Sequence, residues 1–76
     1  MREITTVNGT TVQLADDDRE SFTLSKDFDG ENVLAVAGHI YRGENMLGFK
    51  PTGNPRVAYG PETLRAIADI LEGENQ

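Results

Sequence analysis

The sequence has no cysteine, no tryptophan, a single histidine and no apolar run long enough to cross a bilayer, which takes about 20 residues. The lack of cysteine excludes disulfides, thiolate metal sites and a cysteine nucleophile. The first residues also lack the apolar segment of a signal peptide. We therefore expect a cytoplasmic protein that does not bind membranes and is held together by packing, by self-association, or by both.

Basic side chains are also scarce: 7 Lys and Arg stand against 13 Asp and Glu, and the formal net charge is −6. Binding to a phosphate backbone needs cationic charge, so we expect no direct contact with nucleic acid. The charge is distributed unevenly along the chain. Residues 1–38 hold 3 basic and 8 acidic side chains, whereas residues 39–60 hold 3 basic and 1 acidic. The sequence thus predicts an acidic body with one weakly basic segment.

The length of 76 residues limits the chain to a single small domain, residues 1–76, with a frayed tail at about residues 74–76. Apolar residues make up 37% of the chain. That is enough for one sheet face and one helix, but not for the walls of a deep pocket around a large cofactor. We expect no cofactor.

Two dipeptides predict tight hairpin turns. Asn8-Gly9 suits a two-residue type I′ turn, which would place Val7, Val12 and Leu14 on one face. Asp29-Gly30 predicts a second hairpin, whose pairing puts six apolar residues on one face: Phe22, Leu24, Phe28, Val33, Ala35 and Ala37.

The segment 33–37 is apolar on both faces, which favours a central strand of the sheet. Gly38, which follows it, indicates a bulge or a close approach of two backbones. A third hairpin is expected around residues 43–45, and a short last strand over residues 56–59.

A C-terminal helix is the best-supported element. Gly60 suits its N-cap, Pro61 its first turn and Gly73 its C-cap, and the apolar stripe is formed by Leu64, Ile67, Ala68 and Leu71. The predicted fold is therefore α+β: an antiparallel meander of about five to six short strands, with one C-terminal helix packed on one sheet face.

The helix leaves the other sheet face open, which points to a protein interface. Leu34, Val36 and Ile40 are expected on that face with no cover from the chain, and exposed apolar patches on small proteins usually mark interaction sites. We expect a homodimer or a dedicated protein partner there.

Two acidic segments are candidate partner-binding sites, although charge runs of this kind are usually solvated turns. If they adjoin, they form one surface that imitates a phosphate backbone and blocks a nucleic-acid-binding protein. Small acidic proteins of phages and mobile elements often act as inhibitors, so we expect an inhibitor of this kind. The residues of this expected surface are Asp16, Asp17, Asp18, Glu20, Asp27, Asp29 and Glu31.

The second segment also has the alternating carboxylates of half a calcium loop. The twelfth position counted from Asp27 is Gly38 rather than the Glu that such a loop requires, so we expect no metal site.

The basic segment offers an alternative function, the binding of a nucleotide-like anion. Its cationic side chains suit a phosphate or carboxylate, and a tyrosine suits stacking on a base. The candidate residues are His39, Tyr41, Arg42, Lys50, Arg56 and Tyr59.

Catalysis is not indicated. Ser21 and Ser25 do not lie in a nucleophile elbow, and His39 is the single histidine. The sequence favours a non-enzymatic, acidic protein-binding module over a small-ligand binder.

Overall fold

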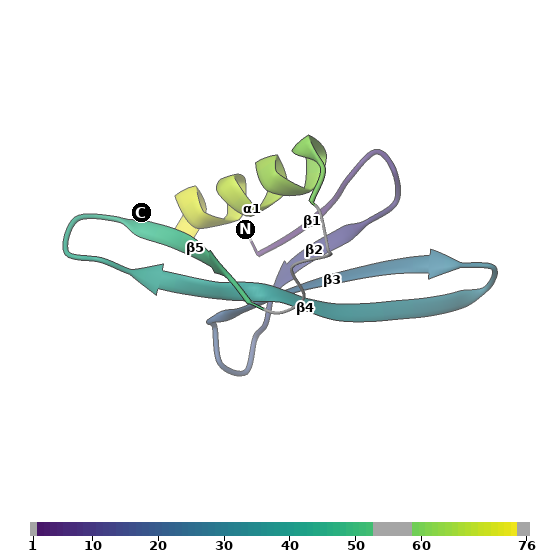
Figure 1. Ribbon diagram of the computed structural model, residues 1–76, viewed down its shortest axis with the longest axis horizontal. Helices are drawn as coiled ribbons and strands as arrows, with labels where there is room; N and C mark the ends of the chain where they lie inside the picture. The colour runs from purple at the N-terminus through teal and green to yellow at the C-terminus, as the bar shows by residue number, and fades with distance from the viewer. Residues whose placement is uncertain (1, 53–58, 75–76) are drawn as a thin grey trace.

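The computed structural model describes residues 2–52 and 59–74. Five strands form one antiparallel sheet in the order β1-β2-β3-β4-β5, and the sheet curls into a half-barrel with the helix packed against it (Figure 1). The α+β meander is therefore confirmed; most of the additional strand expected over 56–59 lies outside the described residues. The elements are β1 (Glu3–Thr5), β2 (Thr11–Leu14), β3 (Ser21–Phe28), β4 (Glu31–Arg42), β5 (Leu47–Pro51) and α1 (Pro61–Glu74).

The β1–β2 hairpin differs from its predicted register by one residue. Ile4 pairs with Val12, and the turn has three residues, because the amide of Thr6 donates to the carbonyl of Thr10 at 2.8 Å. Gly9 has a φ of +86°, the left-handed position that closes a three-residue loop. The slip moves Ile4 onto the core face and leaves Val7 almost fully exposed, so the expectation that Val7 lies on the core face was wrong.

The β3–β4 hairpin has the predicted register up to the pair Thr23–Val36. The two-residue turn is confirmed, since Asp29 and Gly30 both have positive φ. A β-bulge follows, so Phe22 faces Gly38 rather than Ala37. Gly38 thus lies at a bulge, as its identity indicated. A bulge inverts the in–out alternation beyond it, which determines where the later residues of β4 point.

The core gathers where the bulge, the N-terminal strands and the helix meet. Its fully buried side chains are Val12, Leu14, Phe22, Ala37, Ala66, Ile67 and Ile70. The rings of Phe22 and Phe49 meet edge to face at 5.6 Å between centroids, and Phe49 meets Tyr59 in the same way at 6.4 Å. This aromatic row joins β3, β5 and the segment before the helix.

The helix begins as predicted, since the carbonyl of Gly60 accepts the first helical hydrogen bond, from Leu64. Its buried face is formed by Thr63, Ala66, Ile67 and Ile70, one position away from the predicted stripe, and Leu64 faces water.

The helix also continues past the expected cap at Gly73 to Glu74, whose carboxylate lies 3.4 Å from the guanidinium of Arg2. Of the tail expected to fray, Glu74 thus belongs to the helix, and residues 75–76 lie outside the described residues. No helix in the described part of the chain is long and apolar enough to cross a membrane.

The β3–β4 hairpin projects well beyond the core (Figure 1). β2 pairs with β3 only as far as Ser25, and β5 pairs with β4 only from Gly38 onward. Residues 26–33 therefore form a two-stranded ribbon, and residues 34–36 of β4 pair with β3 alone. We call residues 26–36 the arm, and the molecule measures 43 × 26 × 26 Å. β4 lies between β3 and β5 from Gly38 onward, but residues 33–36 pair with β3 alone and are all exposed, so the central position expected for the segment 33–37 does not extend over them.

Candidate functional site

The inner side of the arm, on the same sheet face as the core, carries an apolar hollow of about 300 Å³. Phe28 and Val33 are about half exposed there, and the amino group of Lys26 lies 5.4 Å from the centre of the Phe28 ring. The hollow can take an apolar side chain of a partner. Its lining residues are Thr10, Leu24, Ser25, Lys26, Phe28, Val33 and Ala35.

The outer side of the arm is apolar as well. Leu34 is 66% exposed and Val36 is 54% exposed, as the sequence indicated. Ile40 does not belong with them, because the bulge turns it to the other face, where it packs against the core. The apolar interface expected from Leu34, Val36 and Ile40 is thus reduced to its first two members.

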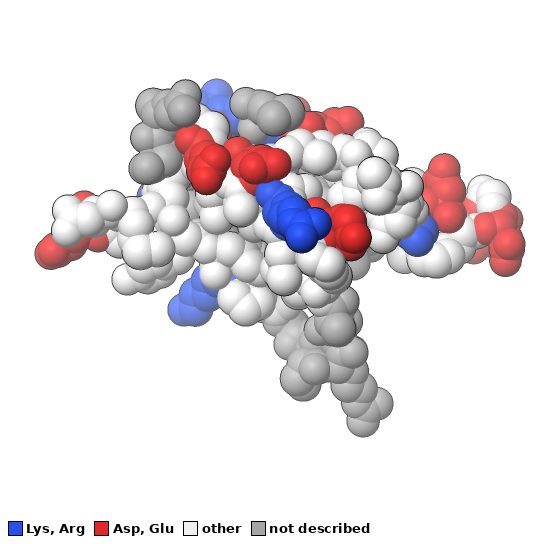
Figure 2. Space-filling model, turned by 90° about the horizontal axis from the view of Figure 1, so that it is seen from above, with Lys and Arg blue, Asp and Glu red and all other residues white. Residues whose placement is uncertain are grey.

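The tip of the arm is acidic. Asp27, Asp29 and Glu31 are all exposed, and the side-chain amide of Asn32 donates to Asp27 at 2.9 Å. Figure 2 shows red atoms gathered at the end of the arm, at the right, beside the white surface of the ribbon. The arm therefore combines apolar sides with a negative end.

The second acidic segment, residues 16–20, lies between β2 and β3, at the opposite end of β3 from the tip. A strand of eight residues spans about 25 Å, so the two segments do not adjoin. The condition for one surface built from all seven carboxylates, that the two segments adjoin, is therefore not met. The meander topology is the reason, because consecutive loops of a meander alternate between the two ends of the sheet.

Asp18 has a structural role within that loop. Its carboxylate accepts hydrogen bonds from the amides of Glu20 and Ser21, at 2.9 and 3.1 Å, and from the Ser21 hydroxyl at 2.7 Å. The bond from the Glu20 amide is the main cause that lowers the pKa of Asp18 from 3.8 to about 2, and the two bonds from Ser21 add to it. The charged form of Asp18 therefore holds the start of β3.

We expect Asp18 to contribute stability that depends on pH in the acid range. Because its folded pKa is lowered, the contribution is present above pH 3.8 and is lost as the pH falls towards 2. Melting temperatures of the wild type and of Asp18→Asn, measured between pH 2 and 6, should differ most at the upper end and converge near pH 2. A constant difference across that range would contradict the role, as would an NMR titration of the Asp18 carboxyl with its midpoint near 4.

The candidate anion-binding residues do not converge. His39 and Lys50 are paired across β4 and β5 with Tyr41 nearby, all on the outer face, whereas Tyr59 lies on the core side. The Tyr59 hydroxyl donates to the carbonyl of Ala37 at 3.2 Å, and its ring packs on Phe49, so it is not free to stack on a base.

The two remaining candidates add little to an anion site. Arg42 pairs with Leu47 at the far end of β4, and by the alternation of the strand it is directed to the other face from Tyr41. Arg56 lies outside the described residues.

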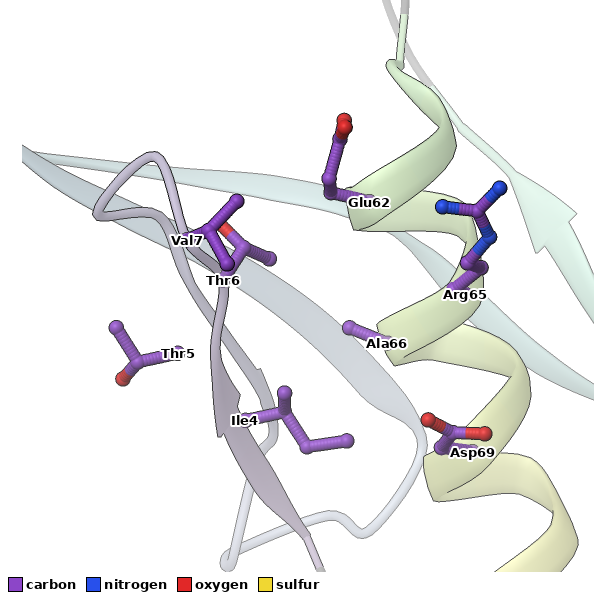
Figure 3. Close-up of a pocket in the computed structure, with 8 residues that line it drawn as sticks. All are labelled: Ile4, Thr5, Thr6, Val7, Glu62, Arg65, Ala66 and Asp69. Atoms are coloured by element: carbon purple, nitrogen blue, oxygen red, sulfur yellow. The ribbon is translucent and has the colours of Figure 1, made fainter.

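A second hollow, of about 220 Å³, separates β1 from α1. Figure 3 shows the side chains of Ile4 and Ala66 pointing toward each other across it, while Thr5 points away. Its rim carries Glu62, Arg65 and Asp69, a mixture of signs with no common direction. In residues 2–52 and 59–74, no three histidine or carboxylate side chains gather as metal ligands would.

Sequence reasoning found the acidic tip, Leu34 and Val36 but missed the inner hollow, because it placed Phe28 and Val33 under the helix. A signal for their exposure exists in the element lengths. A helix of 14 residues is about 21 Å long, whereas a strand of 12 residues extends about 40 Å, so the helix leaves much of β4 uncovered.

Comparisons of the chain with family models, with curated proteins and with solved structures give no match. The candidate site therefore rests on the structure. Within the described residues, the arm combines a hollow, exposed apolar side chains and a concentrated charge.

Proposed function

We propose that the protein is a non-enzymatic binding module that engages another protein through the arm. The observation that supports this most is that residues 26–36 leave the core with apolar side chains exposed on both faces. Small proteins rarely expose such surface without a partner for it. The proposed compartment is the cytoplasm, as the sequence led us to expect.

The chemistry of the arm suggests the kind of surface it recognises. An apolar side chain of the partner fills the inner hollow beside Phe28, while basic side chains of the partner lie against Asp29 and Glu31 at the tip. A basic, nucleic-acid-binding protein offers such a surface, and covering it would inhibit that protein. This is how an inhibitor from a phage or a mobile element would act.

No observation favours the alternative of a nucleotide-like ligand. The outer-face trio of His39, Tyr41 and Lys50 lines neither hollow, and Tyr59 is occupied by its contacts in the core. The proposal therefore rests on the arm alone.

Two pairs of matched variants test the proposal by affinity capture from the native host lysate. Asp29→Asn with Glu31→Gln removes two charges from the tip, and Asp17→Asn with Glu20→Gln removes two from the other acidic loop. We expect a partner to bind about tenfold more weakly to the tip variant and unchanged to the loop variant, and its binding to weaken as salt rises.

The apolar pair is Phe28→Ser in the arm and Leu64→Ser on the helix, which replace side chains of similar exposure, 54% and 48%. We expect Phe28→Ser to lower the affinity for the partner at least tenfold and Leu64→Ser to leave it unchanged. A set of captured proteins that is the same for all four variants would refute the proposal, as would capture that does not respond to salt.

A further inference from the structure

The arm has an open strand edge. β5 covers the edge of β4 only from Gly38 to Arg42, so no described strand lies beside residues 31–36 on that side. A row of unpaired backbone groups is a template for another strand, and proteins usually protect it with charged side chains, proline or a bulge. Residues 31–36 read Glu-Asn-Val-Leu-Ala-Val, so the one charge lies at the tip, and the bulge comes only after Val36.

The turn fixes which backbone groups point outward. Asp29 and Gly30 form a two-residue hairpin turn, so Phe28 and Glu31 close the hairpin as a hydrogen-bonded pair. Alternate residues of β4 then bond to β3, and the amides and carbonyls of Asn32, Leu34 and Val36 point to the open edge. The edge therefore offers a regular set of donors and acceptors.

We propose that the occupant of this edge is a second copy of the chain, whose own residues 31–36 pair antiparallel with it about a two-fold axis. Two residues that lie opposite each other in a sheet project from the same face. The odd positions of residues 31–36 all project from the inner face of the arm, so only registers that pair odd with odd positions are allowed. Centring the axis on Val33 places Val33 against Val33 of the second copy and Leu34 against Asn32 of the second copy.

Pairing length and steric limits select that register, because a shift towards the tip would leave only residues 31–33 of each copy paired. It places Glu31 opposite Ala35 of the second copy, so that no like charges face each other. The next allowed register would bring Glu31 opposite Ala37 of the second copy. The carbonyl of Ala37 already accepts a hydrogen bond from the amide of Thr52 at 3.2 Å, so the tip would meet the end of β5.

Charge favours the same arrangement. In the proposed register the two turn residues, Asp29 and Gly30, reach the level of position 36 of the other copy, three residues or about 10 Å along the strand from the pair His39–Lys50. Lys50 lies on the edge of β4 that the tip approaches, whereas the acidic loop 16–20 lies on the other side of β4, beside His39. The cationic side chain nearest to each acidic tip is therefore Lys50 of the opposite copy.

Apolar side chains favour a dimer as well. Pairing through the edge also joins the Leu34 and Val36 side chains of two copies on one outer face.

A cysteine scan tests the register directly, because the chain has no cysteine of its own. At the axis, two Val33→Cys residues form a non-hydrogen-bonded pair with Cα atoms about 4.5 Å apart, within the range for a disulfide. Ala35→Cys, on the same face, would face Glu31 of the second copy instead. We expect mild oxidation to give a covalent dimer from Val33→Cys and at least tenfold less from Ala35→Cys.

Light scattering supplies the second measurement. The wild type should have about twice the mass of 8.3 kDa, Leu34→Thr should remain dimeric, and Leu34→Pro, which removes an outward amide, should dissociate at least tenfold more readily. A monomeric wild type at millimolar concentration, or equal cross-linking at both cysteines, would overturn the inference.

The inference rests on the proposed function in treating the arm as the binding element, yet the two fail separately. A monomer whose partner binding is still lost in Phe28→Ser refutes the dimer and leaves the proposed function in place. A dimer whose captured proteins are the same for every variant does the reverse.

Discussion

Replacing Phe22 by alanine should unfold a large part of the population at 37 °C. Phe22 is fully buried and meets the Phe49 ring edge to face at 5.6 Å, and Phe→Ala in a core costs about 3–5 kcal/mol. A domain of this length has a stability of about 4–11 kcal/mol, so most of it can be lost. We expect the melting temperature, followed by circular dichroism, to fall by at least about 12 °C.

Phe28 is the matched control. It lies on the same strand and the same face but is 54% exposed, because it belongs to the arm. Phe28→Ala should cost about 1 kcal/mol, the contribution of partial burial and of the nearby Lys26 ammonium. Equal losses from the two substitutions would show that the core is not centred where β3 crosses the bulge.

Gly38→Ala should be the most damaging of the small substitutions. A Cβ at this position would lie 2.5 Å from the carbonyl oxygen of Lys50 and 2.6 Å from a ring carbon of Phe49, and neither can move without disturbing the sheet or the core. Overpacking of this kind costs about 1–3 kcal/mol. We expect a drop in melting temperature of about 4–8 °C for each kcal/mol lost.

Gly48 on the neighbouring strand provides the comparison. The nearest atom to a Cβ there is the terminal methyl of Met46 at 3.4 Å, which is the flexible end of a side chain. Gly48→Ala should change the free energy of unfolding by no more than about 0.5 kcal/mol. A Gly38→Ala protein as stable as Gly48→Ala would mean that β4 and β5 are further apart at the bulge than described.

Local signals in the sequence predicted the elements well. Asp29-Gly30 gave the correct turn and register, because both residues adopt the positive φ that this turn requires. Gly60-Pro61 marked the start of the helix, and the identity of Gly38 indicated the bulge. Each of these features depends on the conformational preferences of one or two residues, which a single sequence reveals.

Features that depend on packing between elements were not predictable in the same way. Asn8-Gly9 is compatible with two loop lengths, and only the packing of Ile4 into the core selects the three-residue loop. The bulge was expected near Gly38, but its effect on Ile40 follows from the exact pair that it interrupts. The extent of the arm depends on where β2 and β5 stop pairing.

The candidate site shows the same division. The acidic tip could be found because turn chemistry places Asp29 and its neighbours at the end of a hairpin. The separation of the two acidic loops follows from strand order, which composition does not contain. Tyr59 was misassigned because the sequence gives no sign that its hydroxyl bonds to Ala37 across 22 positions.

The ion pair between Arg2 and Glu74 brings the two ends of the described chain together, beside the helix and remote from the arm (Figure 1). Termini that meet in this way tolerate fusions and circular permutation. A fluorophore, an affinity handle or a second domain attached at either end would therefore lie on the opposite side of the molecule from the hairpin tip. The arm thus projects from a compact body that carries both ends, and the protein can be displayed or immobilised through either end without covering the arm.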